Sequence, residues 1–148
     1  MQKKDNLILI TGALGFIGSG VVRSLNDKGY YNLLLVDDFD KSEKWKNLVS
    51  KKFVDLIATD KIFDYLNSSK VKILSIIHLG ACSDTTCDDS KYLWENNFRF
   101  SQNLFLYALK NNIRFIYASS AATYGDGSFG FCDDETGTQR RQTNRAGV

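Results

Sequence analysis

The sequence predicts a doubly wound α/β protein, in which a parallel sheet carries helices on both faces. Two observations support this prediction: apolar runs of strand length alternate with longer stretches of helical period, and the strand-like runs are continuously apolar. A continuous apolar run is typical of a strand buried on both faces, and strands separated by helices form a parallel sheet through crossover connections. The expected order is β-α-β-α-β-α-β-α-β.

The individual elements follow from local patterns. The first buried strand is expected at residues 7–11 and the first helix at 16–28, where Gly29 ends it. The apolar face of this helix consists of Ile17, Val21, Val22 and Leu25. Further strands are expected at 33–37, 53–58, 73–78 and 115–119, and helices at 42–49 (capped by Ser42), at 60–67 and within 90–111.

This pattern stops after Tyr124. Residues 125–134 are loop-like, and residues 136–148 have almost no apolar side chains and no period, a composition typical of disorder. The length of 148 residues fits one domain. We therefore expect a single domain over residues 1–135, truncated after about the fifth strand, and a disordered or non-native tail over residues 136–148.

Composition excludes several classes of function. Hydrophobic residues make up 43% and charged residues 24%, as in ordinary globular proteins. Three of the 19 basic residues lie in the last twelve positions, where no acid occurs, so residues 1–136 carry 16 bases and 17 acids. A body with a formal charge of −1 has no nucleic-acid footprint. No stretch reaches the roughly 18–20 apolar residues of a membrane span, and glycines interrupt the apolar N-terminal stretch that could imitate a signal peptide.

Cysteine and histidine usage also bears on chemistry. The three cysteines, Cys82, Cys87 and Cys132, cannot all pair within the chain, which favours reduced thiols in a cytoplasmic protein. The spacing of Cys82 and Cys87 is not that of a metal site, and His78 is the single histidine. We therefore expect no metal.

A glycine loop at residues 11–18 carries the strongest signal. Its glycines, Gly12, Gly15 and Gly18, are spaced by three residues, and the loop follows a buried strand and opens a helix. This context favours dinucleotide binding over a merely structural turn. Gly12 would allow the tight turn, Gly15 the approach of a pyrophosphate and Gly18 close packing of helix on strand, with the helix N-terminus facing the phosphates.

Charged residues after the second strand bear on which dinucleotide binds. Asp37 lies 19 residues after Gly18, the expected place for a carboxylate that bonds a ribose 2′-hydroxyl, which favours NAD. Asp38 adds a second negative charge. Lys41, Lys44 and Lys46 follow and could neutralise the 2′-phosphate of NADP, although a solvated helix face is the commoner reason for such a run.

The chain resembles the extended short-chain dehydrogenases/reductases, whose T-G-x-x-G-F-I-G pattern matches residues 11–18. Three more segments are similar to the ADP-glyceromanno-heptose 6-epimerases: Lys-Trp-Lys-Asn-Leu at 44–48, His-Leu-Gly-Ala-Cys-Ser-Asp-Thr-Thr at 78–86, and Tyr-Ala-Ser-Ser-Ala-Ala-Thr-Tyr-Gly at 117–125. The resemblance covers residues 6 to about 135 and implies a Rossmann fold. A methyltransferase of related fold fits these segments less well.

The resemblance implies NADP as the cofactor, with NAD as the other possibility. Lys44 matches a lysine near the ribose phosphate of the adenosine, and Lys61 is a weaker match to a second such lysine. The glycine loop and the resemblance together give these cofactor-binding residues: Gly12, Gly15, Phe16, Ile17, Gly18, Asp37, Asp38, Lys44, Leu79, Gly80, Ala81, Cys82, Ser83 and Asn96.

Ser120 matches the catalytic serine of that family, whose hydroxyl would bond the substrate oxygen; the alternative is a strand-end serine that bonds local backbone. The family's acid/base is a Tyr-x-x-x-Lys pair, yet no tyrosine occurs after Tyr124 and no lysine after Lys110. We therefore expect the N-terminal fragment of an epimerase, inactive alone, with an uncovered apolar helix face that includes Tyr92, Phe100, Leu104 and Tyr107.

For the complete enzyme, the resemblance implies interconversion of ADP-D-glycero- and ADP-L-glycero-manno-heptose through a 6-keto intermediate, for lipopolysaccharide core biosynthesis. It also implies a cytoplasmic homo-oligomer that binds neither nucleic acid nor membrane. Two alternatives are a non-catalytic dinucleotide-binding or defunct fragment and another NAD-dependent sugar-nucleotide epimerase or dehydratase.

Overall fold

The computed structural model describes residues 6–39, 42–84, 86–120, 124–127 and 131. The chain divides into two units, residues 1–117 and 118–148, which are described separately. In the second unit, the rings of Tyr124 and Phe131 lie 5.5 Å apart. Cys132 and the predicted tail lie outside the described residues, so the predicted boundary after residue 135 stays a prediction.

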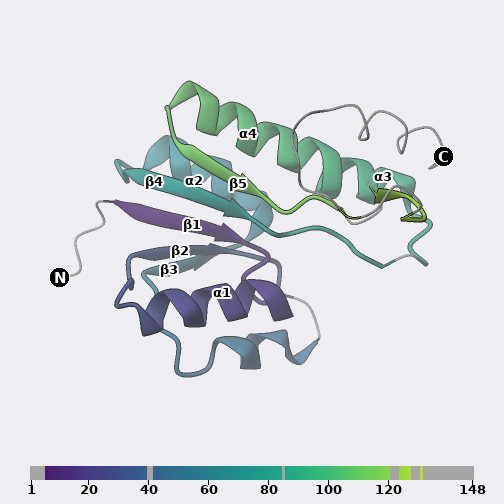
Figure 1. Cartoon of the computed structure of the whole chain (residues 1–148). Coiled ribbons are helices and arrows are strands. Elements are labelled where there is room, and N and C mark those ends of the chain that lie inside the picture. Colours follow the sequence, from purple (N-terminus) through teal and green to yellow (C-terminus); the bar gives the residue numbers. More distant parts are fainter. Residues whose placement is uncertain (1–5, 40–41, 85, 121–123, 128–130, 132–148) are drawn as a thin grey trace. The chain divides into compact units, whose positions relative to one another are not determined.

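The first unit contains a five-stranded parallel sheet of order β3-β2-β1-β4-β5 (Figure 1). The strands are β1 (Leu7–Thr11), β2 (Leu33–Val36), β3 (Asp55–Ile57), β4 (Ile73–His78) and β5 (Arg114–Tyr117). The chain runs outward from β1 to β3 and then returns to place β4 beside β1. This order confirms the doubly wound α/β prediction, with β3 shorter than the six residues expected.

The helices also follow the sequence pattern, with differences in type. They are α1 (Phe16–Asp27), α2 (Ile62–Ser68), α3 (Ser90–Leu93) and α4 (Phe100–Lys110), with 3-10 turns at Glu43–Leu48 and Thr59–Lys61. The predicted helix at 42–49 is thus a 3-10 helix, and Ser42 caps it by accepting from the Lys44 N–H. The predicted long helix is divided, because a π-helical segment, Trp94–Arg99, joins α3 to α4.

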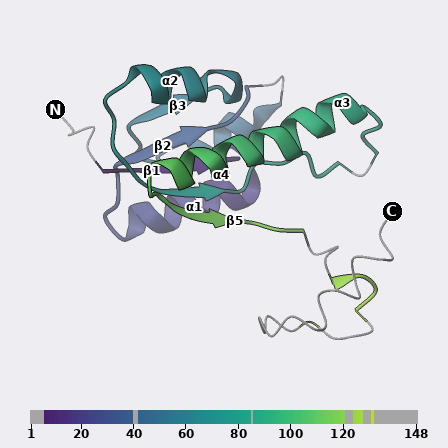
Figure 2. The same cartoon turned by 90° about the horizontal axis from the view of Figure 1, so that it is seen from above.

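Helices pack on both faces of the sheet because both faces of the central strands are apolar. In β2, Leu34 and Val36 belong to the core under α2 and α4, while Leu33 and Leu35 belong to the core under α1. All four side chains are fully buried. Figure 2 shows α2 and α4 on one side of the sheet and α1 on the other. Continuous apolar runs in the sequence therefore reflect burial on two sides.

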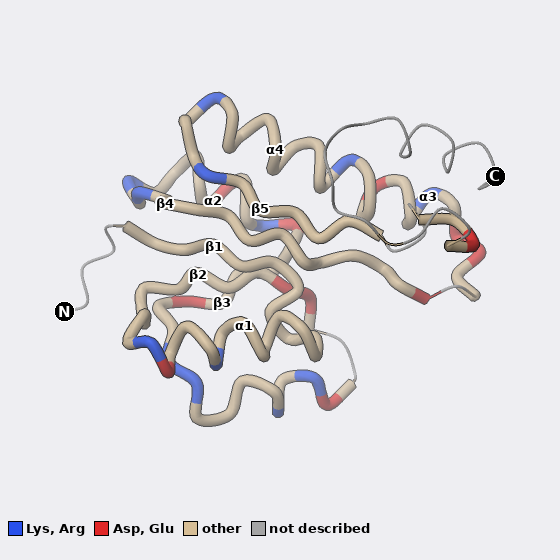
Figure 3. The backbone as a smooth tube through the Cα atoms, viewed as in Figure 1, with Lys and Arg blue, Asp and Glu red and all other residues tan. Residues whose placement is uncertain are grey.

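Charged residues of the first unit are spread over most of its elements rather than gathered on one (Figure 3). Among the described residues, no helix is both long and apolar enough to cross a membrane.

The long helix buries a face that was expected to be uncovered and exposes a different apolar face. Phe100, Leu104, Tyr107 and Ala108 form one stripe at helical spacing. Ala108 belongs to the core beneath α4, and Phe100 and Tyr107 pack against that core. Leu104 is fully buried, and Phe100 and Tyr107 are partly buried, so the prediction that these three lie on an uncovered face is wrong. Tyr92 is exposed, and the exposed apolar residues of α4 are instead Phe105, Leu106 and Leu109.

We expect Leu104→Ala to lower the free energy of unfolding by about 2–5 kcal/mol, because it leaves a cavity at a fully buried position of α4. Leu106→Ala is the matched control on the same helix. Leu106 is about half exposed (52%), so its truncation should change stability by only about 0.5 kcal/mol. Urea titration of both variants measures the difference, and equal losses would contradict the placement of the stripe.

Candidate functional site

A cavity of about 570 Å³ opens where the carboxyl ends of β1, β2 and β4 meet. The chain leaves β1 toward β2 on one side and returns to β4 on the other, so this is the switch point of the doubly wound sheet. Ligands of open α/β sheets bind at this place, and the volume is that of a typical ligand site.

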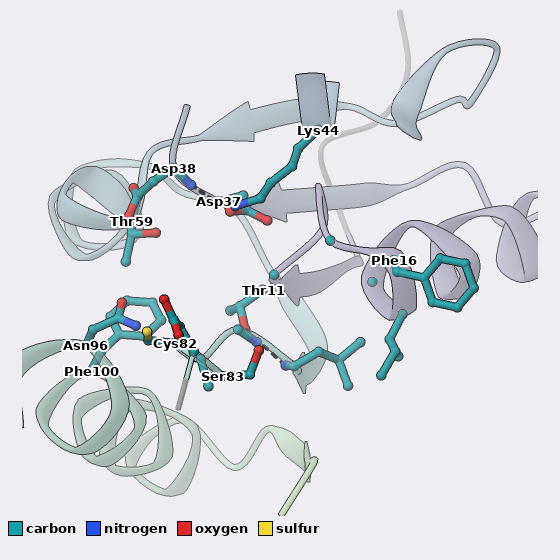
Figure 4. A pocket seen from close by; sticks show the side chains of 18 of the residues that line it. Thr11, Phe16, Asp37, Asp38, Lys44, Thr59, Cys82, Ser83, Asn96 and Phe100 are labelled. Carbon is teal, nitrogen blue, oxygen red and sulfur yellow. Dashed lines mark hydrogen bonds between the residues drawn. The ribbon is translucent and has the colours of Figure 1, made fainter. Parts of the chain in front are cut away.

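Every cofactor-binding residue predicted from the sequence lines this cavity, and the role of each stays a prediction. Figure 4 shows Asp37, Asp38, Lys44 and Thr59 on one side and Cys82, Ser83, Asn96 and Phe100 on the other. The lining residues outside the predicted cofactor-binding set are Thr11, Thr59, Asp84, Tyr92 and Phe100. Lys61 is not among the lining residues; its ammonium group lies 3.0 Å from the carboxylate of Asp60.

The glycine loop is built by backbone contacts that exclude side chains. Gly12 has a φ of +68°, and a Cβ there would lie 2.7 Å from the backbone nitrogen of Gly80. A Cβ at Gly18 would lie only 2.0 Å from the carbonyl oxygen of Gly12. Both glycines are therefore required by the close approach of β1, the start of α1 and the residues after β4.

The N-terminus of α1 points a set of backbone donors at the cavity. Gly15 is the N-cap residue, so no side chain caps the first turn, and no acidic residue lies within that turn. Uncapped N–H groups and the positive end of the helix dipole form a site for an anion such as a pyrophosphate. Phe16 is 91% exposed and Ile17 69% exposed beside these donors, so apolar surface also faces any ligand there.

Asp37 and Asp38 each hold backbone as well as facing the cavity. The Asp37 carboxylate accepts from the N–H of Leu14 at 2.7 Å and from the N–H of Asp38 at 2.8 Å. Asp38 accepts from the N–H of Thr59 at 3.0 Å, which fixes the start of the 3-10 turn after β3. A carboxylate has about four acceptor positions, so Asp37 can still accept from ribose hydroxyls.

Lys44 and Tyr92 add two more polar groups to the lining. The Lys44 side chain extends toward Asp37 (Figure 4). Partial burial raises the pKa of Tyr92, and the negative charge of Asp38 acts in the same direction. The phenol therefore remains protonated at neutral pH and is available to donate a hydrogen bond.

The segment after β4, residues 79–84 (the β4 loop), lines the side of the cavity opposite Asp37 and Lys44. Thr11 Oγ1 accepts from the N–H groups of Leu79 and Gly80 at 3.1 and 3.0 Å. The Asn97 side chain accepts from the Cys82 N–H at 2.8 Å and donates to the Cys82 carbonyl at 3.0 Å. Sequence reasoning missed Asn97 because two adjacent asparagines gave no reason to prefer it over Asn96.

Further predictions concern the catalytic serine, the cysteines and metal binding. Ser120 belongs to the second unit, so its predicted catalytic role stays a prediction. Cys82 and Cys87 are both free thiols. The described part of the chain contains no group of three or more His, Cys, Asp or Glu residues placed to hold a metal ion.

The parallel sheet, the glycine loop and the acid at the end of β2 define the class of dinucleotide-binding α/β folds. The chain belongs to the NAD dependent epimerase/dehydratase family, whose sequence profile matches residues 8–146. It is similar to the solved structure of UDP-glucuronic acid 4-epimerase from Bacillus cereus in complex with NAD, at 25% identity and a TM-score of 0.66 over 81% of this chain and 41% of that one. These findings support a nicotinamide dinucleotide as the cofactor.

Curated relatives are more similar in sequence. The ADP-L-glycero-D-manno-heptose-6-epimerase of Nitratidesulfovibrio vulgaris (strain Hildenborough) is 45% identical over 132 residues, which are 88% of this chain and 41% of the relative. The protein of the same name in Fusobacterium nucleatum is 41% identical over 130 residues, which are 86% of this chain and 39% of the relative. The chain thus spans about two fifths of the length of these relatives, and the predicted resemblance is confirmed.

We expect Gly18→Ala to destabilise the protein by several kcal/mol or to prevent folding, because its Cβ would meet the Gly12 carbonyl. Gly20→Ala is the matched control in the same helix, since a Cβ there meets nothing within 4 Å. That variant should gain about 0.5–1 kcal/mol from helix propensity. Thermal unfolding of both variants checks this pair, and a tolerated Gly18→Ala would refute the close contact.

Proposed function

We propose that this chain supplies the dinucleotide-binding part of an NADP-dependent ADP-glyceromanno-heptose 6-epimerase. The observation that carries the proposal is that one cavity gathers the glycine loop, Asp37, Asp38, Lys44 and the β4 loop. The names of the curated relatives support the choice of substrate. The resemblance further favours a cytoplasmic enzyme that assembles with copies of itself and acts in lipopolysaccharide core biosynthesis.

The residues of the cavity fit a dinucleotide by their chemistry. The first-turn N–H groups of α1 would hold the pyrophosphate, and the missing side chain at Gly15 leaves room for it. Asp37 would accept from the adenosine ribose, and the Lys44 ammonium would offset a 2′-phosphate. When bound, the nicotinamide would accept a hydride from C6 of the heptose and return it to the opposite face.

Catalysis would need groups beyond this cavity. In the proposed reaction, the hydroxyl of Ser120 would donate to the C6 oxygen of the substrate. Removal of the hydroxyl proton requires a base whose pKa lies near neutrality, and the resemblance assigns that step to a Tyr-x-x-x-Lys pair that these 148 residues do not contain. We therefore propose dinucleotide binding, without epimerisation, for these residues alone.

The test of this proposal is binding of NADP and NAD, measured by calorimetry on the folded chain. Gly15→Leu should abolish binding, because a side chain would occupy the pyrophosphate position. Gly20→Leu introduces the same side chain at an exposed position of α1 and should leave binding intact. If the folded chain binds neither dinucleotide, the proposed function is wrong.

Lys44→Ala should weaken NADP binding by about 1.5–3 kcal/mol, the contribution of a hydrogen bond to a charged group. NAD lacks the 2′-phosphate, so its affinity should change little. Lys46→Ala is the matched control, because Lys46 lies on the same 3-10 helix, pairs with Glu43 and is not among the cavity-lining residues. Equal losses of both dinucleotides in Lys44→Ala would exclude contact with the 2′-phosphate.

A further inference from the structure

The single histidine of the chain lies directly behind the cavity. His78 ends β4, is 1% exposed and is not among the cavity-lining residues. Its ring stacks on Tyr117 at 5.4 Å and packs edge-on against Phe100 at 5.7 Å. Burial lowers the pKa of His78 to about 4, so the ring is neutral at physiological pH and carries one proton.

The hydrogen bonds of Thr11 decide which nitrogen lacks that proton. Thr11 Oγ1 lies 2.6 Å from His78 Nδ1. This oxygen already accepts from the N–H groups of Leu79 and Gly80, so both of its lone pairs are used. Its hydroxyl must therefore donate to Nδ1, which has to be the unprotonated nitrogen.

The other ring nitrogen has a matching environment. His78 Nε2 lies 2.7 Å from Ser101 Oγ, and the Ser101 hydroxyl donates to the backbone carbonyl of Asn97 at 2.7 Å. The Ser101 oxygen is thus an acceptor toward the ring, which places the proton of His78 on Nε2. A proton on Nδ1 instead of Nε2 would point the Nδ1–H at the Thr11 hydroxyl, which is itself a donor. The Thr11 hydroxyl would then have no acceptor.

This network of hydrogen bonds extends to the wall of the cavity. Asn97, whose carbonyl accepts from Ser101, also holds both backbone polar groups of Cys82 with its side chain. Hydrogen bonds therefore hold the β4 loop at two places. Thr11 binds the loop at Leu79 and Gly80, and Asn97 binds it at Cys82. His78 connects the two places, because its ring contacts Thr11 on one side and Ser101 on the other. The π-helical segment contributes Asn97 to this arrangement, and such segments are frequent at functional sites.

We propose that His78 is a positioning residue that, as the neutral Nε2–H tautomer, fixes the shape of the β4 loop against which the dinucleotide binds. This inference rests on the dinucleotide-binding part of the proposed function. It requires a histidine at this position, since an apolar residue at the end of β4 would leave both the Thr11 hydroxyl and the Ser101 oxygen without their ring partner.

The first test needs no substitution. Because His78 is the single histidine, protein labelled with ¹⁵N-histidine gives one pair of ring nitrogen signals. At pH 7 we expect a protonated Nε2 and an unprotonated Nδ1, in one fixed tautomer. A protonated Nδ1, a tautomer mixture or a charged ring would overturn the inference.

The second test removes the acceptor for Nε2–H. Ser101→Ala should make the tautomer signals of His78 heterogeneous, speed hydrogen exchange at the Gly80 and Cys82 amides, and weaken NADP binding about tenfold. Ser68→Ala is the matched control, because Ser68 also donates to the carbonyl four residues earlier (Asp64) but lies on α2, outside the cavity lining. It should alter none of these three readouts.

These readouts separate the two proposals. A wild-type chain that binds no dinucleotide contradicts the proposed function, while ring signals and amide exchange still decide the role of His78. Unchanged ring signals and amide exchange in Ser101→Ala would overturn the inference, whatever the affinity. If Ser101→Ala does not fold, the tautomer of the wild-type ring decides.

Discussion

The structure around the site depends on the close approach of two backbone segments, Gly12 after β1 and Gly80 after β4. A Cβ on Gly12 would lie 2.7 Å from the Gly80 nitrogen, and a Cβ on Gly80 would lie 3.0 Å from the Gly12 nitrogen. Only because these residues approach so closely can the Thr11 hydroxyl accept from two N–H groups of the neighbouring strand's loop. The same contact makes the glycine loop and the β4 loop neighbouring parts of the cavity lining.

The charges of the site are arranged so that two carboxylates can border a site for an anionic ligand. Three backbone N–H groups donate to Asp37 and Asp38, and these donors offset part of the negative charge locally. The Lys44 side chain extends toward Asp37 from the same side of the cavity (Figure 4). Repulsion between Asp37 and a 2′-phosphate is thereby reduced, which supports the proposal that NADP is accepted although the acid at the end of β2 by itself favours NAD.

Sequence patterns predicted the parts of the site that depend on spacing along the chain. The glycine loop and Asp37 could be found because their distances from a buried strand are fixed by the fold. The β4 loop was assigned only through the resemblance, since Leu79 to Ser83 carry no pattern of their own. Asn97 could not be found, because the π-helical segment changes which side chains of the helix face the loop and a regular helical period does not show this. Leu104 was misplaced because the packing of α4 on β4 and β5 is a tertiary contact.

Binding and catalysis are separable in this chain for a structural reason. All residues that line the cavity lie between Thr11 and Phe100, within the first unit, whose sheet and two cores are built entirely from residues 7–117. Proton transfer at the substrate, in contrast, is assigned to Ser120 and to a Tyr-x-x-x-Lys pair outside these 148 residues. The affinity of the cavity for a dinucleotide therefore depends on contacts that need no substrate site. For this reason the affinity for a dinucleotide and the tautomer of the His78 ring both report on the architecture of the site. The absence of turnover would not contradict that architecture.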